Sequence, residues 1–261
     1  MQITIGQYFP GDSPLHRMDP RAKILLTVAM IVGVFLAHSA LSYVVLALFA
    51  AAAILVSRIS AKFIIKGLKP ILFIVIFTFV VNIFFTSGGN ELVRWRFIRI
   101  TDSGVRAALF MALRLILLVI MTQLLTLTTS SLALTDGIEA LLRPLAKIGF
   151  PAHELAMMMS IALRFIPTLM EETDKIMKAQ MARGADFESG NLIQRARAML
   201  PLLVPLFVSA FRRADELALA MEARCYRGGQ GRTRMKQLHF SRLDTIAAGV
   251  VAAVIALAAV L

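Results

Sequence analysis

The sequence has a single cysteine, Cys225, and only four histidines, which are widely spaced. One cysteine excludes an intrachain disulfide and supplies at most one metal ligand. The phosphate-binding pattern G-x-x-x-x-G-K-[ST], the zinc motif H-E-x-x-H and any Cys/His cluster are also absent. We therefore expect no catalytic, cofactor or metal site in this chain.

An apolar N-terminal leader is missing too. Residues 1–20 contain three prolines and two aspartates, and no apolar run that would serve as a cleavable signal peptide. The rest of the chain is strongly apolar, since 58% of its 261 residues are hydrophobic. This composition predicts an all-α polytopic membrane protein inserted through internal segments. The net charge of +12 is then typical of basic cytoplasmic loops, and we expect no nucleic-acid partner.

Five apolar runs predict membrane-spanning helices: Ile24–Ala37, Ala40–Val56, Pro70–Thr86, Val105–Leu127 and Ile246–Leu261. Four cations between 57 and 69, with no acidic residue among them, place that loop and the N-terminus in the cytoplasm. Five spans then place the C-terminus outside. Alternating polar and apolar residues over Leu92–Ile100 predict a hairpin in an outer loop that begins with a turn at 87–90.

Three regions follow from this pattern: a membrane region at 1–130 with four spans, a cytoplasmic region at 131–240, and a last span at 241–261. Charges recur at helical spacing in the middle region. We expect Pro167 to break or kink one helix there, and Thr168-x-x-Glu171 to begin another as a capping box. Pro201 and Pro205 indicate either kinks that let helices move or plain turns.

Two stretches of the middle region repeat each other 41 positions apart. Asp174, Ala179, Ala182 and Arg183 coincide with Asp215, Ala220, Ala223 and Arg224. Each stretch is amphipathic and ends in an Ala-Arg pair, which predicts two similar docking helices. A cation at a helix C-terminus is also ordinary, because it interacts favourably with the helix dipole. Two equivalent arginines favour the docking interpretation, since a guanidinium is a planar fork for carboxylates and carbonyls.

Three motifs carry a family resemblance: L-H-R-M-D-P-R-A-K over Leu15–Lys23, A-R-G over Ala182–Gly184, and A-M-E-A-R-C-Y-R-G-G-Q-G-R-T-R over Ala220–Arg234. With these motifs the chain resembles the transmembrane T component of energy-coupling factor (ECF) transporters over nearly its whole length. Among T components, it is similar to the shared versions that serve several vitamin-binding S components.

The resemblance implies a multi-pass subunit of a prokaryotic cell membrane, with five spans and long cytoplasmic coupling helices. Its expected partners are two ABC-type ATPases, one or more membrane-embedded S components and the lipid bilayer. ATP-driven closure of the ATPases would move the coupling helices, and the S component would tilt to release a vitamin or other micronutrient inside. ATP hydrolysis would belong to the partners, so this subunit would not be an enzyme.

Carried onto this sequence, the resemblance implies six ATPase-docking residues: Ala182, Arg183, Gly184, Ala223, Arg224 and Cys225. The chain departs from the family pattern at Cys225, where glycine is expected. Two consequences are open: a looser contact at this tip, or Gly228 ending the helix instead.

Other residues allow two interpretations. Arg114 lies inside an apolar run and is either a functional site or an interfacial cation, whereas for Arg164 we favour the interface. Met157–Met159 suits an adaptable surface for several S components, or simple core filling. The basic loop 227–236 most simply fixes topology.

Three other functions are alternatives to energy coupling. A stand-alone secondary transporter or channel would show inverted repeats and polar residues at the bilayer midplane, and only Arg114 fits. A membrane enzyme is disfavoured by the lack of paired acids or metal ligands. A surface scaffold that binds lipid alone would tolerate charge reversal at Arg183.

Overall fold

The computed structural model describes residues 8–85, 88, 91–95, 98–187, 189, 191–228 and 237–261. The chain divides into two compact units, which we call the bundle unit (1–141 and 237–261) and the arm unit (142–236). The bundle unit contains these elements: α1 (Pro14–Arg17), α2 (Pro20–Leu36), α3 (Ala40–Ser57), α4 (Ala61–Phe85), β1 (Glu91–Trp95), β2 (Ile98–Thr101), α5 (Asp102–Thr128), α6 (Ser131–Leu142, ending at the boundary) and α9 (Arg242–Val260). The arm unit contains η1 (Arg143–Ile148), α7 (Ala152–Ala182) and α8 (Leu192–Ala223).

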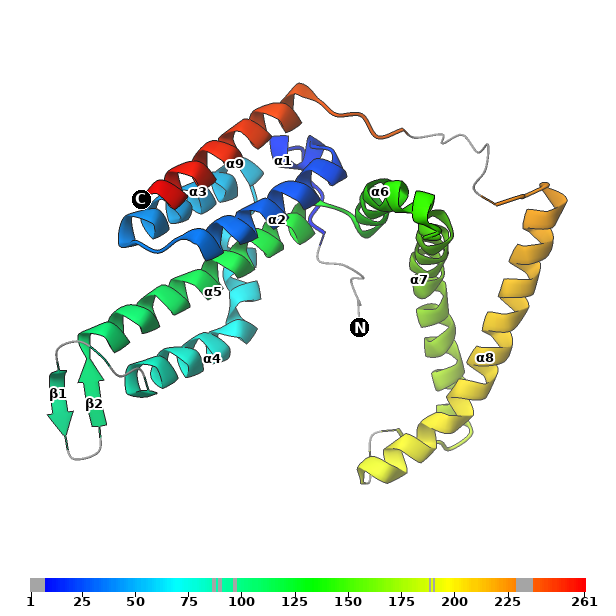
Figure 1. Cartoon of the computed structure of the whole chain (residues 1–261). Helices are drawn as coiled ribbons and strands as arrows, with labels where there is room; N and C mark the ends of the chain where they lie inside the picture. The colour runs from blue at the N-terminus through cyan, green and yellow to red at the C-terminus, as the bar shows by residue number, and fades with distance from the viewer. Residues whose placement is uncertain are drawn as a thin grey trace. The chain divides into compact units, whose positions relative to one another are not determined.

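The core of the bundle unit lies among α2, α3, α5 and α9 (Figure 1). Helices α2 and α3 each pack against both α5 and α9. Val34 and Leu46 are fully buried at their centre, together with Met30, Tyr43 and Met121. Apolar side chains of these four helices thus meet in one cluster, as expected for apolar spans that pack against one another.

Local capping sets where the bundle helices begin. Asp19 caps α2 with Pro20 at the first helical position, and Ser39 caps α3 after the short predicted turn. Ser241 and Asp244 form a capping box at the start of α9. Each of these three helices therefore has a polar residue that satisfies one or more of its first free amides.

Helix α4 begins earlier than predicted. It runs from Ala61 through Pro70 to Phe85 and packs along α5, so Lys62, Lys66 and Lys69 lie in a helix and not in a loop. The predicted hairpin is confirmed as an antiparallel pair of strands, β1 and β2, with Arg94 opposite Arg99. Except for Gly88, the predicted turn at 87–90 lies outside the described residues, as does loop 229–236.

Five described helices are long and apolar enough to cross a membrane, which confirms an all-α polytopic membrane protein apart from the small hairpin. They are α3, α4, α5, α8 (from Ile193) and α9. The sequence predicted a membrane span at α2 and none at α8. Helix α2 has 17 residues, about 25 Å of helix, which is short of a ~30 Å hydrocarbon core although it packs inside the bundle.

The arm unit consists chiefly of two long helices, α7 with 31 residues and α8 with 32. Pro167 lies inside α7, and Pro201 and Pro205 lie inside α8. Of the two alternatives predicted at Pro167, a break is therefore wrong and a kink stays a prediction, and Thr168 is an interior residue and not a cap. Apolar residues keep their helical spacing on both sides of each proline. The free-energy cost of one lost backbone hydrogen bond therefore does not end the helix.

Candidate docking tips of two long helices

The C-terminal ends of α7 and α8, which we call the two tips, have the same backbone geometry. Arg183 follows the last residue of α7 with φ −89° and ψ 8°, and Arg224 follows α8 with φ −91° and ψ 12°. In each tip the next amide donates to the carbonyl three residues back, and the amide after that donates to the carbonyl five residues back. These are two Schellman motifs, which satisfy the last free carbonyls of both helices.

A residue with positive φ follows each arginine. Gly184 has φ 89° and Cys225 has φ 55°. Nothing lies within 4 Å of a Cβ added at Gly184, so this position favours glycine through backbone conformation and not through lack of space. Cys225 adopts the same turn at a cost of about 1 kcal/mol. The alternative that Gly228 ends the helix is wrong, because α8 already ends at Ala223 and Cys225 makes the turn.

All six residues predicted for docking are solvent-exposed. The guanidiniums of Arg183 and Arg224 make no ion pair or hydrogen bond within the described part of the chain. Each tip therefore presents a free guanidinium, with five N–H donors in one plane, beyond a rigid helix end. Such a group is suited to carboxylates or carbonyl ends in a groove of another protein.

An ion pair joins the two helices at equivalent positions of the 41-residue repeat. Arg213 Nη2 donates to Glu172 Oε2 at 2.9 Å, and the two residues are 41 apart. Glu172 precedes Arg183 by eleven residues, and Arg213 precedes Arg224 by eleven. Both tips therefore lie about 16 Å along their helices from this contact.

The Glu172 carboxylate is held in its charged form. A hydrogen bond from Ser209 lowers its pKa most, and the hydrogen bond and charge of Arg213 lower it further.

Because α8 begins soon after α7 ends and runs back along it, the two tips lie at opposite ends of the helix pair (Figure 1).

A second polar site lies in the bundle unit, and we call it the clamp. It is formed by Asp19, Arg21 and Lys23 of α2 with Asp244 of α9. Asp244 Oδ1 accepts from the Asp19 amide at 2.9 Å, and its Oδ2 accepts from the Ser241 amide at 2.7 Å. One carboxylate thus joins the start of α2 to the start of α9, although 225 residues separate them.

Two cations complete the clamp. The Arg21 guanidinium pairs with Asp19 at 2.9 Å, donates to the Leu238 carbonyl at 3.1 Å and lies 4.3 Å from the centre of the Phe240 ring. Burial alone would raise the pKa of Asp19, but the hydrogen bonds and charge of Arg21 outweigh it and lower that pKa. Lys23 Nζ donates to the Thr128 carbonyl at 2.9 Å and so reaches the end of α5.

The clamp was missed by sequence reasoning. The run D-P-R-A-K was recognised only as part of the family motif over Leu15–Lys23. One signal was available: cations at spacing two beside an N-capping aspartate, directly before an apolar run. Nothing in the sequence indicated Asp244 as their partner, because that contact depends on how α9 packs.

The two arginines found in apolar runs differ in their surroundings. Arg114 is hydrogen-bonded inside the bundle unit, whereas Arg164 is exposed. Arg114 Nε donates to the Tyr43 hydroxyl at 3.1 Å, and its Nη2 donates to the Ala37 carbonyl at 3.3 Å. It therefore satisfies the end of α2 at the turn into α3. Arg164 is exposed on α7. Met158 and Met159 are more than half exposed, so core filling does not account for them within this chain.

Comparison with known proteins places this architecture in a family. The family model described as "CbiQ: Cobalt transport protein" matches residues 11–235. The chain belongs to the CbiQ family. The match includes both tips and the start of α2, and it ends before α9.

Relatives in the CbiQ family support a T component of an ECF transporter. The chain is 62% identical over 246 residues to "Energy-coupling factor transporter transmembrane protein EcfT" of Clostridium kluyveri, covering 94% of this chain and 91% of that protein. It is 51% identical to the protein of the same name from Bacillus subtilis over 259 residues, covering 99% and 97%. This CbiQ family member is therefore a bacterial membrane protein and a transmembrane component of an ECF transporter.

Proposed function

We propose that the two tips dock in grooves of two ABC-type ATPases, one tip to each, and that this subunit transmits their ATP-driven motion. The observation that carries the proposal is that the same helix end occurs twice, with Arg183 and Arg224 free and exposed in both. Two similar tips fit two similar partner subunits. The six docking residues are Ala182, Arg183, Gly184, Ala223, Arg224 and Cys225.

The contact between the arms supports transmission of that motion. Glu172 and Arg213 connect α7 to α8, so a displacement of one tip acts on the other helix through a charged hydrogen bond. ATP hydrolysis takes place in the partners. This chain supplies helices that convert their closure into movement of a third subunit.

The third subunit is a membrane-embedded S component that binds a vitamin or other micronutrient. Its proposed contact is the exposed apolar surface of the arm unit. Met158 and Met159 on α7 are 55% and 54% exposed, and Phe207 and Phe211 on α8 are 61% and 68% exposed. Flexible methionines would let one surface accept several S components.

The proposed topology has the N-terminus, α1 and the first turns of α4 in the cytoplasm. Arg58, Lys62, Lys66 and Lys69 are all exposed there, and no acidic residue lies between 40 and 85. A stand-alone transporter has less support, because the intramembrane cation that favoured it, Arg114, is bound to Tyr43 and Ala37.

Co-purification from native membranes tests the docking. The tagged chain is compared with an Arg183→Glu, Arg224→Glu double variant, and Lys178→Glu serves as a matched control because Lys178 is exposed on α7 before the tip. We expect two ATPases with the native chain and the control, and their loss with the double variant. ATPases that remain with the double variant, or that are missing from the native chain under mild conditions, would refute the proposal.

A further inference from the structure

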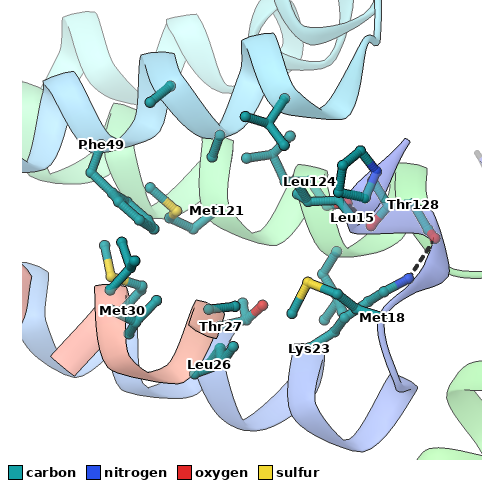
Figure 2. Close-up of a pocket in the computed structure, with 18 of the residues that line it drawn as sticks. Leu15, Met18, Lys23, Leu26, Thr27, Met30, Phe49, Met121, Leu124 and Thr128 are labelled. Carbon is teal, nitrogen blue, oxygen red and sulfur yellow. Dashed lines mark hydrogen bonds between the residues drawn. The ribbon is translucent and has the colours of Figure 1, made fainter. Parts of the chain in front are cut away.

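The bundle unit contains an apolar pocket that the coupling function does not use. It has a volume of about 400 Å³ and lies among α1, α2, α3, α5 and α9, at the end of the bundle where the clamp is (Figure 2). Aliphatic, aromatic and methionine side chains make up nearly all of its wall, including Met30, Phe49 and Met121. A pocket of this size is large enough for a ligand and far larger than the voids of a packed interior.

The pocket is partly open, and the edge where its large lining residues are exposed is formed by α3 and α9. Four large lining residues at that edge are substantially exposed: Val56 at 45%, Leu243 at 41%, Ile246 at 63% and Val250 at 48%. Both helices are apolar enough to cross a membrane, so the opening faces hydrocarbon and not water. An apolar wall of this kind loses contacts when nothing fills it, and the available filler in a bilayer is an acyl chain.

Two arginines flank this opening. Arg58 lies two residues beyond Val56 at the end of α3, and Arg242 immediately precedes Leu243 at the start of α9. Both are exposed, and neither guanidinium makes an ion pair or hydrogen bond with any residue that the structure describes. Their position at helix ends is the level at which phosphate groups of a bilayer lie.

The nearby carboxylates do not neutralise this pair. Asp244 is buried and directed to the amides of Asp19 and Ser241, and Asp19 is paired with Arg21. Lys23, whose stem lines the pocket, turns its ammonium to the Thr128 carbonyl, as Figure 2 shows. The mouth of the pocket therefore carries positive charge, and the interior carries almost none.

We propose that this pocket binds one acyl chain of an anionic phospholipid, whose phosphate is held by Arg58 and Arg242. The ligand class follows from the arrangement of an apolar slot with two free guanidiniums at its rim. The site is independent of tip docking, since all its residues lie in the bundle unit.

Lipid titration followed by native mass spectrometry tests the headgroup. The purified full chain is titrated with dioleoyl phosphatidylglycerol and, separately, with dioleoyl phosphatidylcholine. We expect the anionic lipid to bind roughly 30-fold more tightly, and an Arg58→Asn, Arg242→Gln double variant to lose that preference. Asparagine suits position 58 because its φ is 55°. Arg164→Gln, a change of an exposed arginine in the arm unit, should leave the preference unchanged.

A second pair of variants tests whether the acyl chain occupies the pocket. Ala53→Phe fills the pocket, whereas Ala51→Phe places the same ring on α3 outside the lining. We expect the first to abolish binding of both lipids and the second to leave it intact. Ala247→Phe and its neighbour Ala248→Phe repeat the comparison on α9, should one α3 variant misfold by circular dichroism. Equal binding of the two lipids to the native chain, or unchanged binding to both filling variants, would overturn the proposal.

Discussion

The two units of this chain differ in how much of their apolar surface they bury. In the bundle unit, α5 alone buries seven residues, including Leu117, Met121 and Leu124, and a polar clamp closes one end. In the arm unit, α7 buries only Ala152 and Ala156, and α8 exposes Phe207 and Phe211. The bundle thus has an apolar core of its own as well as exposed apolar side chains such as Phe73 and Phe85, whereas the arms expose apolar surface around almost no core. Changes in the bundle should lower stability, and changes in the arms should alter assembly.

The largest effect is expected at the clamp. Asp244→Ala removes the acceptor of the buried Asp19 amide and of the partly buried Ser241 amide, which should lower the free energy of unfolding by about 3 kcal/mol. Asp174→Ala, at an exposed acid of α7, should change it by less than about 0.5 kcal/mol. Thermal unfolding in one detergent measures both. Equal melting temperatures for the two variants would contradict the comparison.

A smaller loss is expected where α4 meets α5. A Cβ at Gly67 would lie 1.3 Å from Gln123 Nε2, so Gly67→Ala should cost about 1–3 kcal/mol of stability as the amide is displaced. Adding Gln123→Ala should restore most of it. Gly249→Ala in α9 is the matched control, because nothing lies within 4 Å of its added methyl, and it should be neutral or slightly stabilising. A double variant no more stable than Gly67→Ala would show that another contact is responsible.

The ion pair between the arms should contribute less. Glu172 and Arg213 are 25% and 35% exposed, so a double-mutant cycle with glutamine at each position should give a coupling of about 0.5–1 kcal/mol. Because the folded-state pKa of Glu172 is lowered, the coupling is present above its unfolded pKa and is lost as pH falls through the folded value. Unfolding measured at neutral and acid pH checks this. A coupling that persists after the carboxyl is protonated would indicate packing and not charge.

The smallest expected effect tests whether the two tips are equivalent. Cys225→Gly removes a side chain from a left-handed residue and should stabilise the end of α8 by up to about 1 kcal/mol. Gly184→Cys should have the opposite sign at the end of α7. Hydrogen exchange of the amides at 185 and 226, which close the two Schellman motifs, reports each change locally. Changes of the same sign would show that the two turns are not equivalent.

Sequence reasoning predicted most of the helices and both tips, because apolar runs and a 41-residue repeat are local patterns. It was wrong where one local signal competed with another. Pro167 and the pattern Thr168-x-x-Glu171 indicated a boundary, yet α7 continues through both, since apolar periodicity extends on either side. Helix α4 begins before Pro70 for the same reason.

The contacts that sequence could not predict are those between distant segments. Asp244 binds the Asp19 amide across 225 residues, and the pairing of Glu172 with Arg213 depends on where two helices cross. Glu172 lies in no pattern that distinguishes it from the other acidic residues of α7, and the capping-box pattern Ser241-x-x-Asp244 does not indicate the Asp19 amide as a partner. The repeat did contain a hint, since a glutamate and an arginine occupy equivalent positions in its two copies.

The place of the Glu172–Arg213 contact along α7 and α8 has a mechanical consequence. About 20 residues of each helix precede it, and eleven separate it from each tip arginine. If the helices rotate about this contact as a fulcrum, their beginnings sweep nearly twice the arc of their tips. The pair is then a lever with a gain of about two, and a motion of a few ångströms at one end becomes a motion about twice as large at the other.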